Sequence, residues 1–309
     1  MKRSATIYNA NFPEYFRQRG EDQAMINVDG LWHSYSHDKD YALKNVSFEI
    51  SKGEALGFLG PSGAGKSTTQ GILTGLLPLQ KGKAVVGGYD ISKPAREMFN
   101  RIGVSFEQSN VYGKLTALEN LEFYRKLFDV PTADPRSLLK WVGLEKVINK
   151  RAEEFSKGMK HRLTFVRSML NDPDIWFLDE PTTGLDPAIA GQIKDIIKEK
   201  KAGGTTIFLT THNMYVADEI CDRVAFIVDG EIKLIDSPRN LKIKYGERLV
   251  DVEFIDEGSL QQASFSLKDE KERNALLDVI NTKKIETMHT REATLEQIFI
   301  RVTGRELAA

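Results

Sequence analysis

The stretch that decides the fold is Gly60-Pro61-Ser62-Gly63-Ala64-Gly65-Lys66-Ser67-Thr68. An apolar run, residues 55–59, leads into it and predicts a buried strand, and a helical pattern closed by Pro78 leads out of it. Its glycines let successive backbone N–H groups face one anion, and the helix that follows adds its positive end. The spacing is typical of a phosphate-binding loop, with Lys66 for the β- and γ-phosphates and the Ser67 hydroxyl for Mg²⁺. A plain glycine turn between a strand and a helix is the alternative.

Length and composition describe a protein that can bury a large core. The chain has 309 residues and a formal net charge of −1, which offers no basic surface for nucleic acid. Cys221 is the only cysteine, so we expect a small buried side chain and no disulfide framework. The N-terminus lacks the apolar segment of a signal peptide, and no run approaches the roughly 18 residues of a membrane span. We therefore expect a cytoplasmic protein that is soluble in itself and contacts a membrane only through a partner.

Strand and helix patterns alternate through most of the chain. Strand patterns follow the loop at 84–86, 101–106, 174–180, 205–210, 224–228 and 232–235. Helical patterns gather between two of them, at 116–128, 137–144 and 159–170. Asp229-Gly230 predicts a tight hairpin between the last two strands. This order predicts a mainly parallel α/β sheet with a helical insert at about 109–171.

The two ends of the chain differ in composition from this core. Residues 1–24 are expected to form an extension, either frayed or carrying a short helix that rests on a partner or a membrane surface. From residue 237 the pattern predicts a small α+β unit that ends in a helix starting at Thr294. That unit contains no catalytic constellation, so we expect it to modulate activity and to do no chemistry.

Two acids end one of the apolar strands. Asp179 and Glu180 follow the run Ile175-Trp176-Phe177-Leu178, and the carboxyl ends of parallel strands share the edge where ligands bind. We expect Asp179 to hold Mg²⁺, directly or through water, and Glu180 to face a water aimed at the γ-phosphorus.

A second helix terminus is also suited to phosphate. Ser156 is a good N-cap, and Gly158 lets the backbone approach a ligand closely. Two such termini in one chain predict that two copies face each other, each completing the other's site.

With these motifs in this order, the chain resembles the nucleotide-binding subunits of ABC transporters over roughly residues 25–236. The resemblance implies a Walker A loop at 60–68, a Walker B strand at 175–179 and a catalytic glutamate at Glu180. It also implies a Q-loop glutamine at Gln108, which contacts the metal and the nucleophile.

The resemblance assigns three further positions. It implies a switch histidine at His212, a D-loop aspartate at Asp186 and an adenine-stacking aromatic at Tyr35, for which core packing is the alternative. The residues expected to contact ATP are Tyr35, Gly60, Pro61, Ser62, Gly63, Ala64, Gly65, Lys66, Ser67, Thr68, Ser156, Gly158 and Asp186. The expected Mg²⁺ ligands are Ser67, Gln108 and Asp179, and the expected catalytic residues are Glu180, His212 and Gln108.

The signature motif departs from the family pattern. In Phe155-Ser156-Lys157-Gly158-Met159, a lysine replaces the first glycine and a methionine replaces the glutamine, whereas the serine and the second glycine are kept. Similar substitutions occur in ABC-2 type exporters, whose C-terminal Leu-Glu-x-x-Phe helix and Thr-Gly resemble Leu295–Phe299 and Thr303-Gly304 here. We therefore expect a working variant site.

The resemblance implies the fold class and the function together. The fold is an α/β P-loop ATPase with a mainly parallel sheet, an antiparallel β subdomain and an inserted helical subdomain, followed by a small C-terminal α+β domain at 237–309. The function is the ATP-binding and ATP-hydrolysing subunit of an exporter, a homodimer bound to a separate permease on the inner face of the cell membrane. One alternative is a soluble ABC ATPase acting on ribosomes or DNA; another is a nucleotide-binding regulatory module without turnover.

Overall fold

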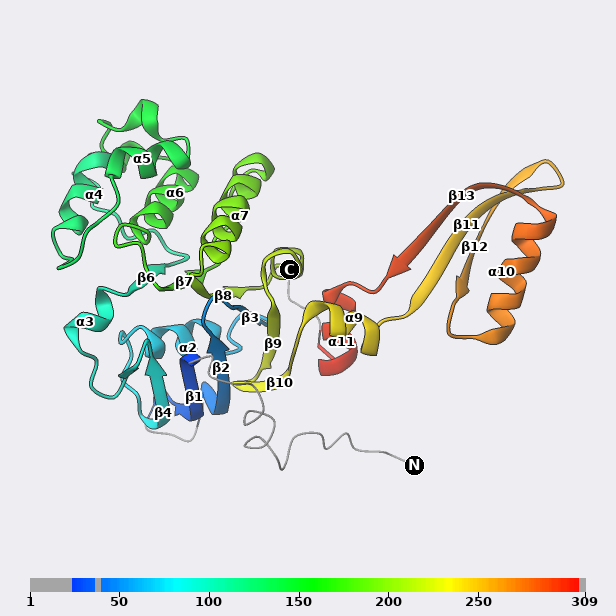
Figure 1. Ribbon diagram of the computed structural model, residues 1–309, viewed down its shortest axis with the longest axis horizontal. Helices are drawn as coiled ribbons and strands as arrows, with labels where there is room; N and C mark the ends of the chain where they lie inside the picture. The colour runs from blue at the N-terminus through cyan, green and yellow to red at the C-terminus, as the bar shows by residue number, and fades with distance from the viewer. Residues whose placement is uncertain (1–23, 37–39, 306–309) are drawn as a thin grey trace.

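The computed structural model describes residues 24–36 and 40–305, and the expectation for residues 1–23 lies outside the described residues. Figure 1 shows three regions: a central region with two sheets, a group of helices at the upper left, and a strand-and-helix unit that projects to the right. None of the helices in the described part of the chain has the length and apolar character that a membrane crossing requires.

The central sheet has six strands in the order β10-β9-β3-β8-β7-β6. Its strands are β3 (Ala55–Leu59), β6 (Ile102–Ser105), β7 (Ile175–Asp179), β8 (Thr206–Thr211), β9 (Arg223–Val228) and β10 (Glu231–Asp236). All neighbouring pairs are parallel except β9 and β10, which form the predicted hairpin with positive φ at Asp229 and Gly230. Every residue of β3, β7 and β8 is buried, as a parallel sheet covered on both faces requires. The carboxyl ends of these three neighbouring strands therefore lie side by side.

A second, antiparallel sheet covers one face of the first. It has the order β2-β1-β4-β5, with β1 (Ala24–His33), β2 (Leu43–Ser51), β4 (Lys81–Val86) and β5 (Tyr89–Asp90). Phe48 of this sheet packs against Phe58 and Phe208 of the central sheet, with ring centroids 4.8 and 5.9 Å apart. Ile72 and Leu73 of α2 (Lys66–Leu73) join the same apolar cluster, which fixes the helix behind the phosphate-binding loop.

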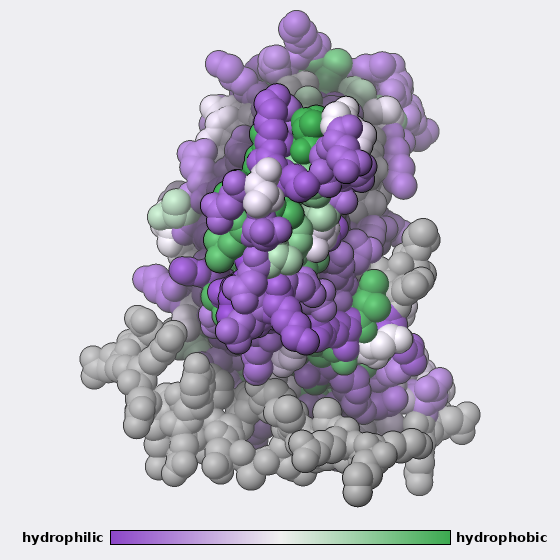
Figure 2. All heavy atoms as spheres, turned by 90° about the vertical axis from the view of Figure 1, so that its right-hand side faces the viewer, coloured by the Kyte–Doolittle hydropathy of each residue, from purple (hydrophilic) through white to green (hydrophobic). Residues whose placement is uncertain are grey.

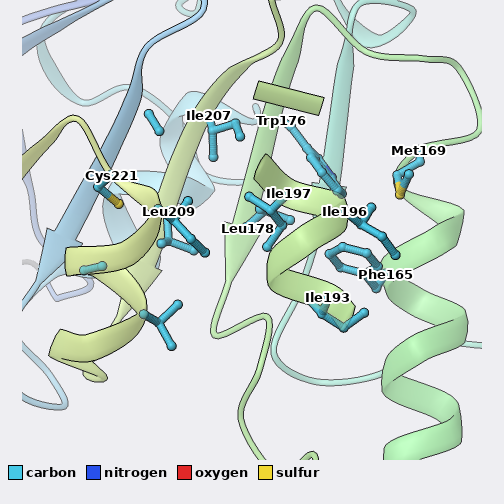
Figure 3. Close-up of a cluster of buried hydrophobic side chains, with 14 of the residues drawn as sticks. Phe165, Met169, Trp176, Leu178, Ile193, Ile196, Ile197, Ile207, Leu209 and Cys221 are labelled. Atoms are coloured by element: carbon cyan, nitrogen blue, oxygen red, sulfur yellow. The ribbon is translucent and has the colours of Figure 1, made fainter. Parts of the chain in front are cut away.

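Helices cover the opposite face. They are α6 (Lys157–Arg167), α7 (Pro187–Ala202) and α8 (Met214–Ile220), and Figure 3 shows side chains of α6 and α7 beside those of β7 and β8. Phe165, Trp176 and Ile193 are buried there, and the Trp176 indole N–H donates to Ser168 Oγ at 2.8 Å. Cys221 lies in this cluster, and burial raises the pKa of its thiol, which confirms the small buried side chain expected from the sequence.

The helical insert comprises several short helices. They are α4 (Ala117–Arg125), α5 (Pro135–Trp141), α6 and the 3₁₀ turns η2 (Glu145–Val147) and η3 (Ala152–Glu154), whereas α3 (Arg96–Phe99) precedes β6 and lies outside the insert. The Thr116 hydroxyl and the Glu119 carboxylate form the predicted capping box at the start of α4. Helix α6 begins two residues before the expected Met159, because the Ser156 hydroxyl accepts from the Met159 N–H and so places Lys157 in the first turn.

The projecting unit is a three-stranded antiparallel sheet with one helix. Its strands β11 (Arg248–Asp256), β12 (Ser259–Ser266) and β13 (Lys284–Glu292) lie in the order β12-β11-β13, and α10 (Glu270–Thr282) packs on one face. Figure 2 views this end of the molecule and shows apolar side chains gathered on a mostly polar face. The exposed large apolar side chains of this unit are Leu260, Leu277, Ile280 and Met288. Strand β13 was not predicted, because only Ile285 and Met288 interrupt its polar sequence.

Two helices connect this unit to the central region. Helix α9 (Pro238–Tyr245), which was not predicted, and α11 (Leu295–Thr303) both contribute buried side chains to the main core. The Phe299 ring lies 5.2 Å from the Phe226 ring of β9 and is fully buried. The predicted capping box of Thr294 and Gln297 starts α11. The last helix therefore packs with the central sheet, whereas β11–β13 and α10 have a small core of their own.

Candidate functional site

The phosphate-binding loop connects β3 to α2 in a conformation that only glycine tolerates at two positions. Gly63 and Gly65 have φ of +77° and +106°, and a Cβ on Gly60 would lie 2.1 Å from the Ile227 carbonyl oxygen. Within the described residues, the backbone N–H groups of Gly63, Gly65, Lys66 and Ser67 donate to no other group. These free donors at a helix N-terminus form an anion-binding nest.

Lys66 lies over this nest. Its Nζ donates to the carbonyl oxygens of Gly60 at 2.7 Å and Pro61 at 3.0 Å, and the residue is buried. Burial lowers the pKa of Lys66, and the negative charges of Glu180 and Asp179 oppose that shift. The Lys66 ammonium group therefore lies between the phosphate-binding loop and the carboxylates of Asp179 and Glu180.

Ser67 and Asp179 meet across the sheet edge. Ser67 Oγ donates to Asp179 Oδ2 at 3.3 Å, and Thr210 Oγ1 donates to Asp179 Oδ1. Burial raises the pKa of Asp179, and the neighbouring charge of Glu180 adds to the shift, whereas the two hydroxyl contacts oppose it. A buried carboxylate beside a second carboxylate and a serine hydroxyl fits Mg²⁺, which takes oxygen ligands and would relieve the repulsion. The described residues hold no cluster of three or more His, Cys, Asp and Glu side chains.

Glu180 is buried and held by donors on both carboxylate oxygens. Oε2 accepts from Thr211 Oγ1 at 2.9 Å and from Thr183 Oγ1 at 3.0 Å. Oε1 accepts from the His212 N–H at 2.8 Å and lies 2.6 Å from His212 Nδ1. The backbone φ of Glu180 is +48°, an unusual value for a residue with a side chain, and this strain is typical of functional positions. The structure thus brings Glu180 and His212 together.

Tyr35 lies beside the same helix. Its hydroxyl is 3.0 Å from Thr68 Oγ1, and 68% of the residue is exposed. The buried His33 ring meets it edge-on at 4.9 Å, which supports one side of the tyrosine. The exposed ring face next to the phosphate-binding loop is available for a base, so the core-packing alternative for Tyr35 is wrong.

The signature and D-loop residues lie apart from the loop. Ser156 caps α6, and Asp186 caps α7 by accepting from the Ile189 N–H at 3.1 Å. A Cβ on Gly158 would lie 3.6 Å from Leu185 Cδ2, so the two segments pack against each other. Among the described residues, no hydrogen bond or ion pair links Ser156, Gly158 or Asp186 to residues 60–68.

Gln108 is exposed beyond the end of β6, and its side chain makes no hydrogen bond to any described residue. The pKa of Lys66 is lowered mainly by burial and that of Asp179 is raised mainly by burial; the charge of Glu107, the neighbour of Gln108, like that of Glu180, opposes the first shift and adds to the second. We did not single out Glu107 from the sequence, although its place beside Gln108 was a usable signal.

Three threonines that contact the two acids were also missed. Thr210 and Thr211 end β8 directly before His212, and Thr183 follows Glu180 in the turn that leads to α7. The pair before His212 could have been found, because side chains at the end of β8 must face the end of the adjacent β7.

Comparison with known proteins gives consistent relatives over almost the whole chain. The family described as "ABC transporter" matches residues 43–183. The fluoroquinolones export ATP-binding protein of Mycobacterium tuberculosis (strain CDC 1551 / Oshkosh) is 49% identical over 284 residues, 92% of this chain and 94% of that protein. The linearmycin resistance ATP-binding protein of Bacillus subtilis (strain 168) is 30% identical and covers 92% of this chain and 99% of its own length.

Solved structures match a large part of the chain. A dimeric ATP-binding cassette in a post-hydrolysis state, bound to ADP and inorganic phosphate, has a TM-score of 0.63 and 28% identity. The match covers 69% of this chain and 98% of that one. The predicted α/β P-loop fold is confirmed by this likeness and by the parallel and antiparallel sheets described above.

Proposed function

This chain belongs to the ABC transporter family as an ATP-binding, ATP-hydrolysing export subunit, and from that premise we propose that it drives export through a separate permease. The observation that carries the proposal is the meeting of Lys66, Ser67, Asp179 and Glu180 at one sheet edge. Ser67 Oγ lies 3.3 Å from Asp179 Oδ2, and the Glu180 carboxylate contacts His212 at that edge.

Binding of ATP is divided between the loop and its surroundings. The free N–H groups of the loop and the Lys66 ammonium bind the β- and γ-phosphates, and Tyr35 stacks on the adenine. Ser67 and Asp179 would hold Mg²⁺, with Gln108 as a further ligand. The bound ion would neutralise charge on the phosphate oxygens.

Hydrolysis depends on Glu180 and His212. Glu180 orients a water whose oxygen bonds to the γ-phosphorus while the bond to the β–γ bridging oxygen breaks, which yields ADP and phosphate. Its carboxylate has about four acceptor positions, and four donors already face them. One donor must leave before the carboxylate can accept from water. We assign this step to the His212 ring, whose side chain is 53% exposed and can turn toward the γ-phosphate.

The active assembly is a homodimer of this chain. Ser156 and Gly158 are not connected to the loop of their own copy, and they would reach the ATP held by the loop of a second copy, with Asp186 at the same interface. The dimeric structure with ADP and phosphate supports this arrangement. No nucleic-acid partner is proposed.

The permease contact is assigned to the exposed aromatic pair Tyr112 and Phe123 of the helical insert. They are 48% and 42% exposed, and their rings meet edge-on at 5.1 Å. Exposed apolar patches of this kind mark protein–protein contacts. The chain would thus sit in the cytoplasm at the inner face of the cell membrane and touch the membrane only through the permease.

We propose three domains: an extension at 1–24, an ATPase domain at 25–236 with a helical subdomain at about 109–171, and an accessory domain at 237–309. The side chains of α9 and α11 that are buried in the ATPase core support a packed connection between the last two.

An accumulation assay tests the function. The Mycobacterium tuberculosis relative is named for export of fluoroquinolones, so we take a fluorescent fluoroquinolone as the first substrate to test. Cells that express the chain together with its permease should accumulate less drug than cells with the Lys66→Ala variant. Equal accumulation for fluoroquinolones and for other drug classes, together with no phosphate release by the pure chain, would reject the proposal.

A further inference from the structure

His161 is a buried histidine that the reaction described above does not use. It lies in the second turn of α6, the helix that Ser156 caps, and only 5% of it is exposed. Its Nδ1 is 3.2 Å from the backbone carbonyl oxygen of Thr183, and its Nε2 is buried with no partner among the described residues. The ring thus makes one specific contact, and that contact is with the segment after Glu180.

The protonation of this ring follows from its partner. A carbonyl oxygen only accepts, so Nδ1 must carry the proton. Burial lowers the pKa of His161, which keeps the ring neutral and leaves Nε2 bare. His161 is therefore a fixed donor to Thr183.

Thr183 continues the connection to Glu180. Its hydroxyl donates to Glu180 Oε2 at 3.0 Å, and its N–H donates to the Glu180 carbonyl oxygen at 3.2 Å. The segment between them is short, and Glu180 itself has the strained φ of +48°. Such a strained backbone conformation persists only when several surrounding contacts stabilise it. The Thr183 hydroxyl is one of those contacts, and His161 fixes the residue that carries it.

We propose that His161 is a positioning residue for ATP hydrolysis: by holding the Thr183 carbonyl it sets the Thr183 hydroxyl against Glu180 and so orients the carboxylate. The contact of Gly158 with Leu185, one turn earlier on α6, joins the same two segments. The first turns of α6, which face the ATP of the other copy, are thus connected to the catalytic carboxylate of their own copy. This inference rests on the proposed role of Glu180.

The test compares kcat and KM for ATP·Mg²⁺, measured by phosphate release with the full chain. His161→Leu and Thr183→Val should each lower kcat about 3- to 10-fold, the effect of one lost hydrogen bond, with little change in KM. His161→Asn should keep kcat near that of the wild type, because its side-chain amide nitrogen takes the place of Nδ1. Thr182→Val is the matched control, since the Thr182 hydroxyl makes no hydrogen bond among the described residues.

The double variant separates this role from general packing. If His161 acts through the Thr183 hydroxyl, combining His161→Leu with Thr183→Val should lower kcat no further than the larger single effect. Additive losses, a wild-type kcat for His161→Leu, or an equal loss for His161→Asn would each overturn the inference. Should His161→Leu fail to fold, His161→Gln replaces it, because its amide lies at the Nε2 position and cannot restore the contact. A wild-type chain without turnover would reject the proposed function instead.

Discussion

His212 Nδ1 lies 2.6 Å from Glu180 Oε1, so the two side chains that we propose act on the attacking water form a hydrogen bond with each other. The two differ in freedom: Glu180 is buried among four donors, whereas the His212 side chain is 53% exposed. The exposed histidine has room to leave this contact, whereas the buried glutamate does not. Under the proposed function, movement of His212 is the step that frees an acceptor position on Glu180 for water.

Lys66→Ala should abolish nucleotide binding. The variant removes the ammonium that lies over the loop and opposes the charges of Asp179 and Glu180 there. Calorimetry with ATP·Mg²⁺ measures this loss. Lys83→Ala, an exposed lysine of β4, is the control and should bind as the wild type does. Wild-type affinity in Lys66→Ala would refute the phosphate-binding assignment.

Two variants of Tyr35 distinguish the contribution of ring stacking to ATP affinity from that of the hydroxyl hydrogen bond. Tyr35→Ala should weaken ATP binding by the energy of one base stack, about 1–3 kcal/mol. Tyr35→Phe keeps the ring and loses only the contact with Thr68 Oγ1, so its affinity should stay close to that of the wild type. Titration with a fluorescent ATP analogue compares them. Equal weakening in both variants would show that the hydroxyl, and not the ring, matters.

The parts of this site that sequence predicts are those whose chemistry is local. The loop from Gly60 to Thr68 carries its own glycines, lysine and serine, and its spacing alone indicates phosphate. Asp179 and Glu180 were equally readable, because an apolar strand that ends in acids places them at the ligand edge. The hydrogen bonds that fix the Glu180 carboxylate could not be predicted from the sequence. Its donors come from the end of β8 and from the turn before α7, and only the register of β7 and β8 brings them together.

Acid should destabilise the fold through its buried histidines. Burial lowers the pKa of His33 and of His161 below the ordinary 6.5. As pH falls below 6.5, these two histidines therefore bind protons in the unfolded chain while they stay neutral in the folded chain. Their contribution to stability is complete above that pH and is lost as pH decreases through it. Urea unfolding at about pH 7.5 and pH 5.5 measures the change.

His161→Asn should reduce this loss of stability, since the asparagine amide does not titrate. The exposed His289 provides the control, and His289→Asn should leave the pH dependence as it is in the wild type. A wild-type free energy of unfolding that is the same at both pH values would contradict the expectation.

The way in which the accessory unit packs on the ATPase core could not be read from sequence. The sequence predicts the apolar face of α11, which carries Leu295, Ile298 and Phe299. It does not predict which part of the protein that face packs against. In the structure it covers the central core beside Phe226, and the strands between α9 and α11 form the separate part.

A chain from which only β11–β13 and α10 are excised should therefore fold, whereas a chain truncated before α9 should be destabilised. The ideal Cβ position of Gly246 lies 3.1 Å from Ala293 Cβ, so residues 247–292 can be removed and the ends joined by a short glycine-serine link. We expect that variant to fold and to hydrolyse ATP. Removal of residues 237–309 takes away the buried Phe299, a loss of about 3–5 kcal/mol from that side chain alone, and should destabilise the chain. Thermal unfolding compares the two, and a truncated chain as stable as the excised one would contradict this packing argument.

Glu180→Gln tests the dimer and the chemistry together. The amide nitrogen can face the hydroxyls of Thr183 and Thr211, which are able to accept, while the amide oxygen stays opposite the His212 N–H, so the fold should survive. Turnover should fall about 10²- to 10⁴-fold, the usual loss for a general base, and ATP binding should persist because Lys66 and Asp179 are unchanged. Loss of a negative charge beside the γ-phosphate favours the closed state, so the variant should elute as a dimer with ATP·Mg²⁺ in size-exclusion chromatography. Adding Ser156→Arg should return it to a monomer, because the larger side chain fills the γ-phosphate position of the partner copy. Undiminished phosphate release in Glu180→Gln, or a dimer that responds neither to ATP nor to Ser156→Arg, would rule out hydrolysis at a shared interface.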